Sequence, residues 1–125
     1  EYPGATVLSR KGAGMTHKEL EAHLLNFSGA WLDFPFGEKV SVYKVGPKEK
    51  GKMFALIQEG SKPLQVSLKC DPQLAKILRE KYESVMPGYH LNKKHCNTIL
   101  LTGQLEDSEI KDLAYHSYLL VAGAN

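Results

Sequence analysis

Apolar residues at helical spacing open the interpretable part of the chain. Leu20, Leu24 and Phe27 follow one another at intervals of four and three residues, which places them on one face of a helix. Thr16 and Glu19 have the spacing of a capping box, in which each side chain bonds the backbone of the other residue. A first helix is therefore predicted to begin just after Thr16 and to end near residues 28–29, a Ser–Gly pair.

Two further helices are predicted later in the chain. An Asp–Pro pair at residues 71–72 starts the second, because aspartate accepts from free N–H groups and proline fits the first helical position. Acidic residues start the third, over residues 106–122, where they favour the positive end of the helix dipole. The residues expected on the core faces of these two helices are Leu74, Ile77, Leu78, Tyr82, Ile110, Leu113, Ala114, Tyr118 and Val121.

Alternating apolar and polar residues predict the strands of a sheet. In the segment PLQVSLK, Leu64, Val66 and Leu68 alternate with polar side chains, so one face of the strand is buried and the other meets water. Between the first helix and the first strand, the segment GAWLDFPFG is expected to be a loop in which Phe34 and Phe36 fill the edge of the core. The predicted strands cover residues 39–45, 52–59, 63–69 and 97–103, with one or two strands after the second helix.

These elements predict an α+β fold in the order α-β-β-β-α-β-β-α. We expect a mostly antiparallel sheet with helices packed on one face and the other face open to water. At 125 residues and 42% hydrophobic composition, the chain has material for one core. We expect residues 1–14 to be a flexible extension or a leader added for expression, and residues 15–125 to be the domain.

The composition indicates the cellular location and the state of the cysteines that we expect for this protein. The sequence shows no apolar run long enough to span a bilayer and no secretory signal pattern, so we expect a cytoplasmic protein without membrane association. Cys70 and Cys96 lack the framework of further cysteines that a disulfide scaffold needs, and reduced, partly buried thiols are predicted.

Charge is distributed unevenly along a chain whose net charge is only +2. Residues 39–94 carry twelve basic and five acidic side chains, whereas residues 1–38 carry three and five and residues 95–125 carry one and four. This pattern favours an electropositive face that attracts phosphate or acidic partners. The alternative is an ordinary solvated surface on which the charges mix in three dimensions.

Basic and hydrogen-bonding residues gather in two places, the connection between the first two strands and the segment MPGYHLNKKHCN (residues 86–97). Lysines can contact phosphates, and Asn or His can reach bases or backbone. Two structural explanations remain open: exposed lysines protect sheet edges, and His90, Asn92 and Asn97 satisfy backbone groups in an irregular connection. The candidate nucleic-acid contacts are Lys44, Lys48, Lys50, Lys52, Lys69, His90, Asn92, Lys93, Lys94, His95 and Asn97.

Catalysis and metal binding receive less support. Among the five histidines and two cysteines there is no CxxC, HxxxH or HExxH spacing. The sequence also lacks GxSxG, GxGxxG and GxxxxGK[ST], which signal a nucleophile or a nucleotide. We therefore predict no catalytic residue, no metal site and no cofactor. An enzyme built around His90 and His95 remains a third hypothesis, which requires a deep pocket joining them to Cys70.

Three longer segments carry a family resemblance. SLKCDPQLAKILREKY, MPGYHLNKKHCNTILLTGQL and the later HSYLLV resemble the MmcQ/YjbR family of small bacterial proteins, and FPFG and KMFAL fit as well. The resemblance covers residues 15–121. It implies a compact α+β fold similar to CyaY, the bacterial frataxin, and to secretion chaperones, and it implies a DNA-binding label. The positions that match the family pattern are Ser67, Leu68, Lys69, Pro87, Gly88, His90, Leu91, Asn92, Lys93, His95 and Asn97.

The chain departs from the family pattern at Cys96, where a tryptophan is usual. If that ring stacks on a ligand in relatives, this protein lacks the stacking. The frataxin comparison also differs in charge, because the acidic ridge on the first helix of frataxins is represented here only by Glu19 and Glu21.

Two functions from different classes follow. The first is a non-enzymatic DNA-binding domain that holds phosphate with the basic hairpin and with Asn92, Lys93 and Lys94, and lays the polar sheet face carrying Gln65, Ser67 and Lys69 along the backbone. The second is a protein-interaction or chaperone-like module that uses an exposed sheet face or edge, with a protein partner or a homodimer.

Overall fold

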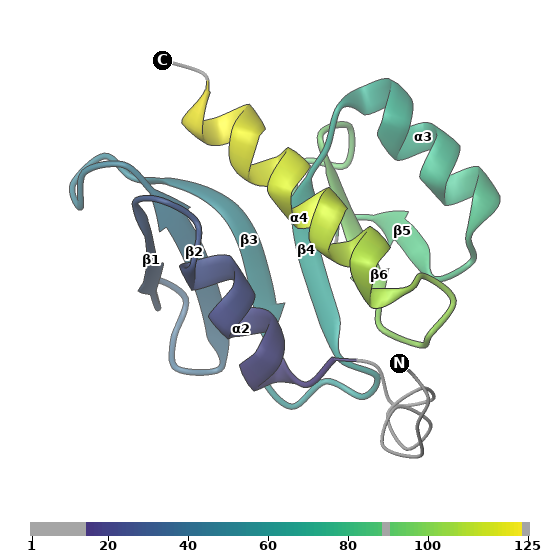
Figure 1. Cartoon of the computed structure of the whole chain (residues 1–125), viewed down its shortest axis with the longest axis horizontal. Helices are drawn as coiled ribbons and strands as arrows, with labels where there is room; N and C mark the ends of the chain where they lie inside the picture. The colour runs from purple at the N-terminus through teal and green to yellow at the C-terminus, as the bar shows by residue number, and fades with distance from the viewer. Residues whose placement is uncertain (1–14, 89–90, 124–125) are drawn as a thin grey trace.

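The structure is built around a six-stranded antiparallel sheet with the strand order β1-β2-β3-β4-β6-β5. The computed structural model describes residues 15–88 and 91–123 (Figure 1). Along the chain the elements are α2 (His17–Leu25), β1 (Ala30–Asp33), β2 (Val40–Val45), β3 (Lys52–Gln58), β4 (Gln65–Lys69), α3 (Pro72–Lys81), β5 (Val85–Pro87), β6 (Cys96–Leu100) and α4 (Asp107–Ala122). The α+β class, the antiparallel sheet and the helices between and after the strands are confirmed.

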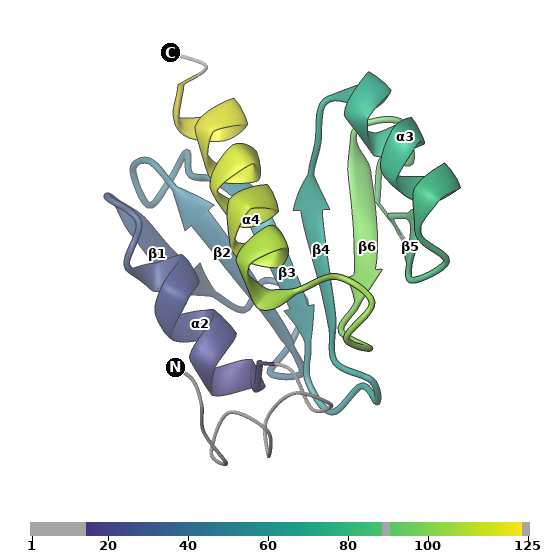
Figure 2. The same ribbon diagram turned by 45° about the vertical axis from the view of Figure 1, so that its right-hand side comes forward.

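The three helices of the described residues lie on one face of the sheet (Figures 1 and 2). α2 packs near β1 and β2, α4 crosses β3 and β4, and α3 lies beside β5 and β6. The core between the layers joins apolar side chains from the sheet and from α2 and α4, and its fully buried members include Leu20, Leu24, Phe54, Ile57, Val66, Ile99 and Ile110. The opposite face of the sheet carries no helix among the described residues.

The helix starts predicted from sequence form as expected. Thr16 Oγ1 accepts from Glu19 N at 3.1 Å and Glu19 Oε1 accepts from Thr16 N at 3.0 Å, which completes the capping box of α2. Asp71 accepts from Gln73 N and Leu74 N, both at 3.1 Å, at the start of α3. Local hydrogen bonding therefore sets these two helix starts.

The structure differs from the predictions at the first edge of the sheet. Residues 30–33, predicted as part of a loop, form β1 and pair with residues 42–45 of β2. The prediction that Phe34 and Phe36 fill the edge of the core is wrong: their side chains are 47% and 67% exposed. They follow β1 on the turn that leads to β2, beyond the end of the core layer.

Core positions on α3 also differ from the prediction. Ile77 was expected in the core but is 56% exposed, and Ala75 takes the buried position. α3 lies over the narrow edge formed by β5 and β6, so only a limited part of its surface faces the sheet. The small side chain of Ala75 lets the helix backbone come close to β6.

One hydroxyl group joins α4 to two neighbouring strands. Residues 55–57 of β3 pair with residues 66–68 of β4. Next to the last of these pairs, Ser117 of α4 bonds both strands. Its Oγ donates to Phe54 O at 2.5 Å and accepts from Lys69 N at 2.8 Å, and the residue is 0% exposed. The Ser117 hydroxyl thus replaces a direct strand-to-strand bond and fixes α4 across the sheet.

Two further expectations concern the chain as a whole. The described helices include none with the length and apolar content needed to cross a bilayer. Residues 1–14, expected to be an extension or leader, lie outside the described part of the chain.

Candidate functional site

The strand register brings the lysine-rich segments to one end of the sheet. Val45 pairs with Lys52 across the hairpin, and Lys69 pairs with Cys96, at the start of β6. Because β3, β4 and β6 alternate in direction, the 46–51 hairpin, the end of β4 and the 91–95 connection all lie at the end shown uppermost in Figure 2. We call this end of the sheet the basic end; its lysines are Lys48, Lys50, Lys52, Lys69, Lys93 and Lys94.

Arg79 of α3 anchors the 91–95 connection. Its Nε donates to Asn97 Oδ1 at 2.6 Å, and its guanidinium also donates to the carbonyl oxygens of Lys93 and Cys96, the latter at 3.1 Å. Asn97 Nδ2 in turn donates to Ala75 O at 3.3 Å. Because Ala75 and Arg79 are one helical turn apart, one face of α3 holds both the strand and the connection before it.

Asn92 and Asn97 both serve the backbone. Asn92 Oδ1 accepts from Lys94 N at 2.9 Å and from His95 N at 3.2 Å, which forms a compact polar turn. Asn97 is 2% exposed and bonds on both sides of its amide inside the protein. The structural explanation of the motif therefore holds for these two residues, and their side chains are engaged away from a ligand.

Gly88 is required by close packing at the same connection. A Cβ atom at this position would lie 2.9 Å from the Cβ of Cys96 and 3.2 Å from the Cβ of Leu91. Gly88 N also donates to Cys96 O at 2.9 Å. The missing side chain lets β5 and β6 pack closely before the lysine turn, so the glycine of the motif is structural.

Trp31 supports the hairpin at the other side of the basic end. Its Nε1 donates to Gly46 O at 2.8 Å, and the ammonium groups of Lys44 and Lys48 lie 5.5 and 5.4 Å from its ring centre. Lys44 also bonds Asp33 Oδ2 at 2.8 Å, and this bond lowers the pKa of Asp33. The Lys44 ammonium group is therefore bonded to β1. Lys48 lies on the hairpin loop and is exposed.

The remaining candidate residues divide into accessible and engaged groups. His95, Lys50, Lys52, Lys93 and Lys94 are exposed, and Lys69 is half-buried at the end of β4. His90 lies outside the described residues. The predicted polar sheet face does not form as expected, because Ser67 is buried and its hydroxyl bonds that of Thr98 at 2.8 Å.

Both cysteines are free and buried, as predicted. Burial raises the pKa of Cys70 to about 11, and burial also raises the pKa of Cys96. A thiol with a raised pKa carries little thiolate and is a poor nucleophile. The cavity beside Cys70 has a volume of about 10 Å³ and a lining that does not include His95, so it does not form the pocket that an enzyme at these residues would need.

No cluster of three or more His, Cys, Asp or Glu side chains in the described ranges, 15–88 and 91–123, has an arrangement that could hold a metal ion. The chemistry of the basic end is instead that of lysine side chains and backbone amides. Such groups bind anions by charge and hydrogen bonding without a bound cofactor.

Sequence reasoning did not single out Arg79, Trp31 or Ser117, which position the site. Arg79 and Ser117 act between elements that are far apart in the chain, so no local pattern marks them. For Trp31 a signal was present, because an aromatic residue next to leucine is typical of a strand. That signal was outweighed by the Pro–Phe–Gly sequence that follows.

Comparison with known proteins shows to which family the chain belongs. A family model described as YjbR matches residues 25–120. The chain belongs to the YjbR family. Among curated relatives, protein YjbR of Escherichia coli strain K12 is 42% identical over 71 residues, covering 57% of this chain and 60% of the relative. Protein YbdF of Escherichia coli O157:H7 is 36% identical over 90 residues, covering 72% and 70%. Both relatives are described as uncharacterized proteins.

Solved structures agree with the family assignment. A crystal structure of Deinococcus radiodurans protein DR2400, described with the domain DUF419, superposes with a TM-score of 0.85 at 36% identity, covering 91% of this chain and 83% of that one. A crystal structure from Pseudomonas syringae gives a TM-score of 0.72 at 27% identity, covering 86% and 99%. The predicted YjbR family membership and α+β fold are confirmed, and the likeness to CyaY stays a prediction.

Proposed function

We propose that this YjbR-family protein binds the phosphate backbone of DNA at its basic end, without catalysis. The observation that carries the proposal is the strand register, which gathers six lysines from three separate segments at one end of the sheet. Only Glu49 in the hairpin and Asp71 before α3 bring negative charge among these segments, and the Asp71 carboxylate already accepts two backbone bonds. The local charge is therefore strongly positive.

The spacing of the lysines suits a run of phosphates. The hairpin joins β2 and β3 and the 91–95 connection leads into β6, so they lie two to three strand positions apart. At about 4.8 Å between strands, this separation is roughly 10–14 Å. Since each DNA strand presents one phosphate per 3.4 Å of helix axis, a basic end that lies along this axis spans about three to four phosphates of a strand.

The lysines of the 91–95 connection and those of the hairpin are held in place by different residues. Lys93 and Lys94 stand on a turn held by Asn92 and Arg79, so their backbone positions are fixed before a ligand arrives. Lys48 and Lys50 lie on the hairpin, which Trp31 supports through its bond to Gly46 O and its contact with Lys48. Contacts of this kind hold the backbone and carry no base preference, so binding is expected to be insensitive to sequence.

Reversing two charges tests the proposal directly. The Lys93→Glu, Lys94→Glu double variant is expected to weaken binding to a short fluorescein-labelled DNA duplex by at least about tenfold, because two phosphate contacts become repulsions. Fluorescence anisotropy at low and at physiological salt gives the two affinities, with single-stranded DNA as a parallel probe.

The matched control is the Lys39→Glu, Lys111→Glu double variant. Both residues are exposed and lie toward the opposite end of the sheet, so the net charge changes equally while the basic end is intact. We expect its affinity to stay within about threefold of the wild type, because distant charges are screened. Equal weakening in both variants, or no binding by the wild type at low salt, would exclude a site at the basic end.

The protein-interaction alternative would use the face or edges of the sheet. The edge strands β1 and β5 are four and three residues long, and short edge strands offer few free groups for pairing with another chain. If DNA binding is absent, light scattering of the purified protein would show whether it forms the homodimer that this alternative expects.

A further inference from the structure

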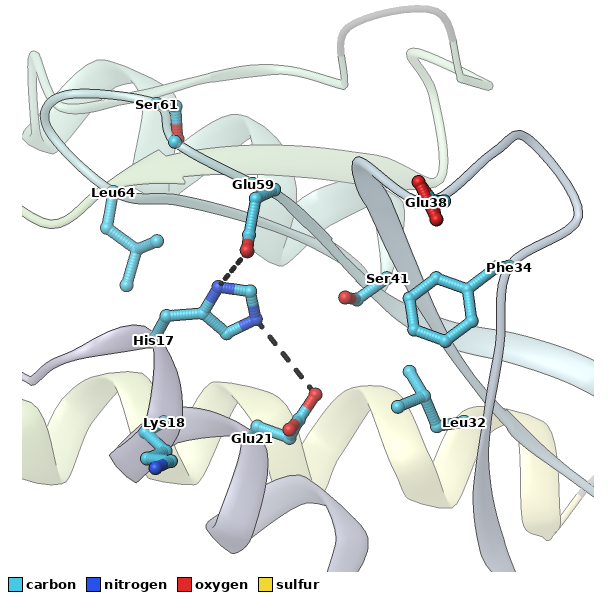
Figure 3. Close-up of a pocket in the computed structure, with 11 residues that line it drawn as sticks. His17, Lys18, Glu21, Leu32, Phe34, Glu38, Ser41, Glu59, Ser61 and Leu64 are labelled. Atoms are coloured by element: carbon cyan, nitrogen blue, oxygen red, sulfur yellow. Dashed lines mark ion pairs between the residues drawn. The ribbon is translucent and has the colours of Figure 1, made fainter.

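A groove of about 670 Å³ lies at the end of the sheet opposite the basic end (Figure 3). Its walls come from the first turns of α2, from β1 and the turn after it, and from the 59–64 turn between β3 and β4. Its volume is in the range of sites that take small organic molecules. None of the residues assigned to nucleic-acid binding lines this groove.

The groove is acidic. Three carboxylates, from Glu21, Glu38 and Glu59, line it together with one lysine, Lys18. His17 stands between two of these carboxylates: its Nδ1 is 3.1 Å from Glu59 Oε1, and its Nε2 is 4.0 Å from Glu21 Oε2 (Figure 3). Three carboxylates outnumber the one lysine and the one histidine of the lining in either form of the histidine, so a cation is the complementary ligand.

One of these carboxylates is held in place from inside the protein. Tyr43 is 0% exposed, and its hydroxyl donates to Glu21 Oε2 at 2.5 Å. Burial and then the bond to Glu21 raise the pKa of Tyr43, so the phenol keeps its proton and remains a donor. Glu21 is therefore oriented at the wall of the groove before any ligand enters.

An apolar wall accompanies the charges. Leu32, Phe34 and Leu64 line the groove, and Phe34 lies across it from His17 (Figure 3). The Phe34 side chain is 47% exposed. An open phenyl ring gives both apolar contact and a negative face toward which a cation is attracted.

We propose that this groove binds a small organic cation, an amine or guanidinium group attached to an apolar body. The charged group faces Glu38 and the carboxylates of Glu21 and Glu59 that flank His17, and the apolar body packs on Phe34 and the two leucines. The proposal is independent of DNA binding, because the groove and the basic end share no residue and lie at opposite ends of the sheet.

Phenethylamine is a suitable probe, with 2-phenylethanol as its neutral counterpart of nearly equal shape. In an NMR titration of the 15N-labelled protein, phenethylamine is expected to shift the amides of residues 17–21, 32–41 and 59–64 in a saturable way. The alcohol is expected to bind at least about fivefold more weakly, the loss of one to two charge contacts. Shifts scattered over the surface, no saturation, or equal binding of the alcohol would each overturn the proposal.

A pair of double variants separates groove binding from general electrostatics. Glu38→Gln with Glu59→Gln removes two groove carboxylates that are exposed on turns, and it is expected to weaken phenethylamine binding about tenfold. Glu80→Gln with Glu83→Gln changes the net charge equally on the exposed end of α3 and the turn after it, and is expected to leave the binding unchanged. Equal effects of the two double variants would contradict a site in the groove. Thermal unfolding of all variants shows that each is folded.

Discussion

Replacing Ser117 with alanine is expected to lower the free energy of unfolding by about 3 kcal/mol, because two buried backbone groups lose their partner. Phe54 O and Lys69 N both bond the Ser117 hydroxyl and have no ladder bond to each other at this position. Alanine fits the space but supplies neither a donor nor an acceptor. Urea unfolding followed by circular dichroism measures the change.

Ser108→Ala is the matched control for this prediction. Ser108 is exposed in the first turn of α4, so the same loss of a hydroxyl there is expected to change stability by no more than about 0.5 kcal/mol. If Ser117→Ala were as mild as Ser108→Ala, the bridge between β3 and β4 would not be a significant support of the fold.

Replacing Arg79 with methionine is expected to cost about 2–3 kcal/mol of stability and to loosen the 91–95 connection. Three hydrogen bonds to Asn97, Lys93 and Cys96 are lost, and the buried Asn97 carbonyl is left without its charged partner. Methionine keeps most of the apolar length of the side chain, so the change reports the guanidinium group.

Lys76→Met removes the same charge from an exposed position on α3 and serves as the control. Hydrogen exchange at the amides of Lys94 and His95 is expected to quicken in Arg79→Met and to stay unchanged in Lys76→Met. The Arg79→Met variant should also bind DNA more weakly than Lys76→Met, since Lys93 and Lys94 lose their fixed positions. Equal stability and equal exchange in the two variants would show that Arg79 does not hold the connection.

Local patterns predicted the features that depend on neighbours in the sequence. The capping box of Thr16 and Glu19 and the Asp71 cap form within four residues, so side chain and backbone meet whatever the rest of the fold does. The alternation of Leu64, Val66 and Leu68 likewise reports one buried sheet face directly. These signals were sufficient for the α+β class and for most element positions.

Features that depend on distant parts of the chain were not predictable in this way. β1 exists because residues 30–33 find partners on β2, and only the assembled sheet shows that this edge is occupied. The exposure of Ile77 follows from where α3 lies on the sheet and not from its own periodicity. Ser117 looks like an ordinary polar residue in α4 until β3 and β4 are placed on either side of it.

In the candidate site, too, some features follow from the local sequence and others depend on distant parts of the chain. The sequence marked the lysines and the polar motif, and the strand register explains why segments up to about fifty residues apart meet at one end of the sheet. Within the motif, Asn92 and Asn97 build the connection together with Arg79 of α3, while Lys93 and Lys94 remain exposed. The proposed binding of DNA at this end of the sheet therefore depends on the lysines.

The measurement that tests the central claim most directly is the salt dependence of DNA binding in two neutralised variants. Lys48→Gln with Lys50→Gln removes charge from the hairpin, and Lys93→Gln with Lys94→Gln removes it from the 91–95 connection. If both segments contact one DNA molecule, each double variant makes the negative slope of log K against log salt shallower by about 2, and the combined variant makes it shallower by about 4. A slope that one of the two double variants leaves unchanged would contradict a single binding surface at the basic end.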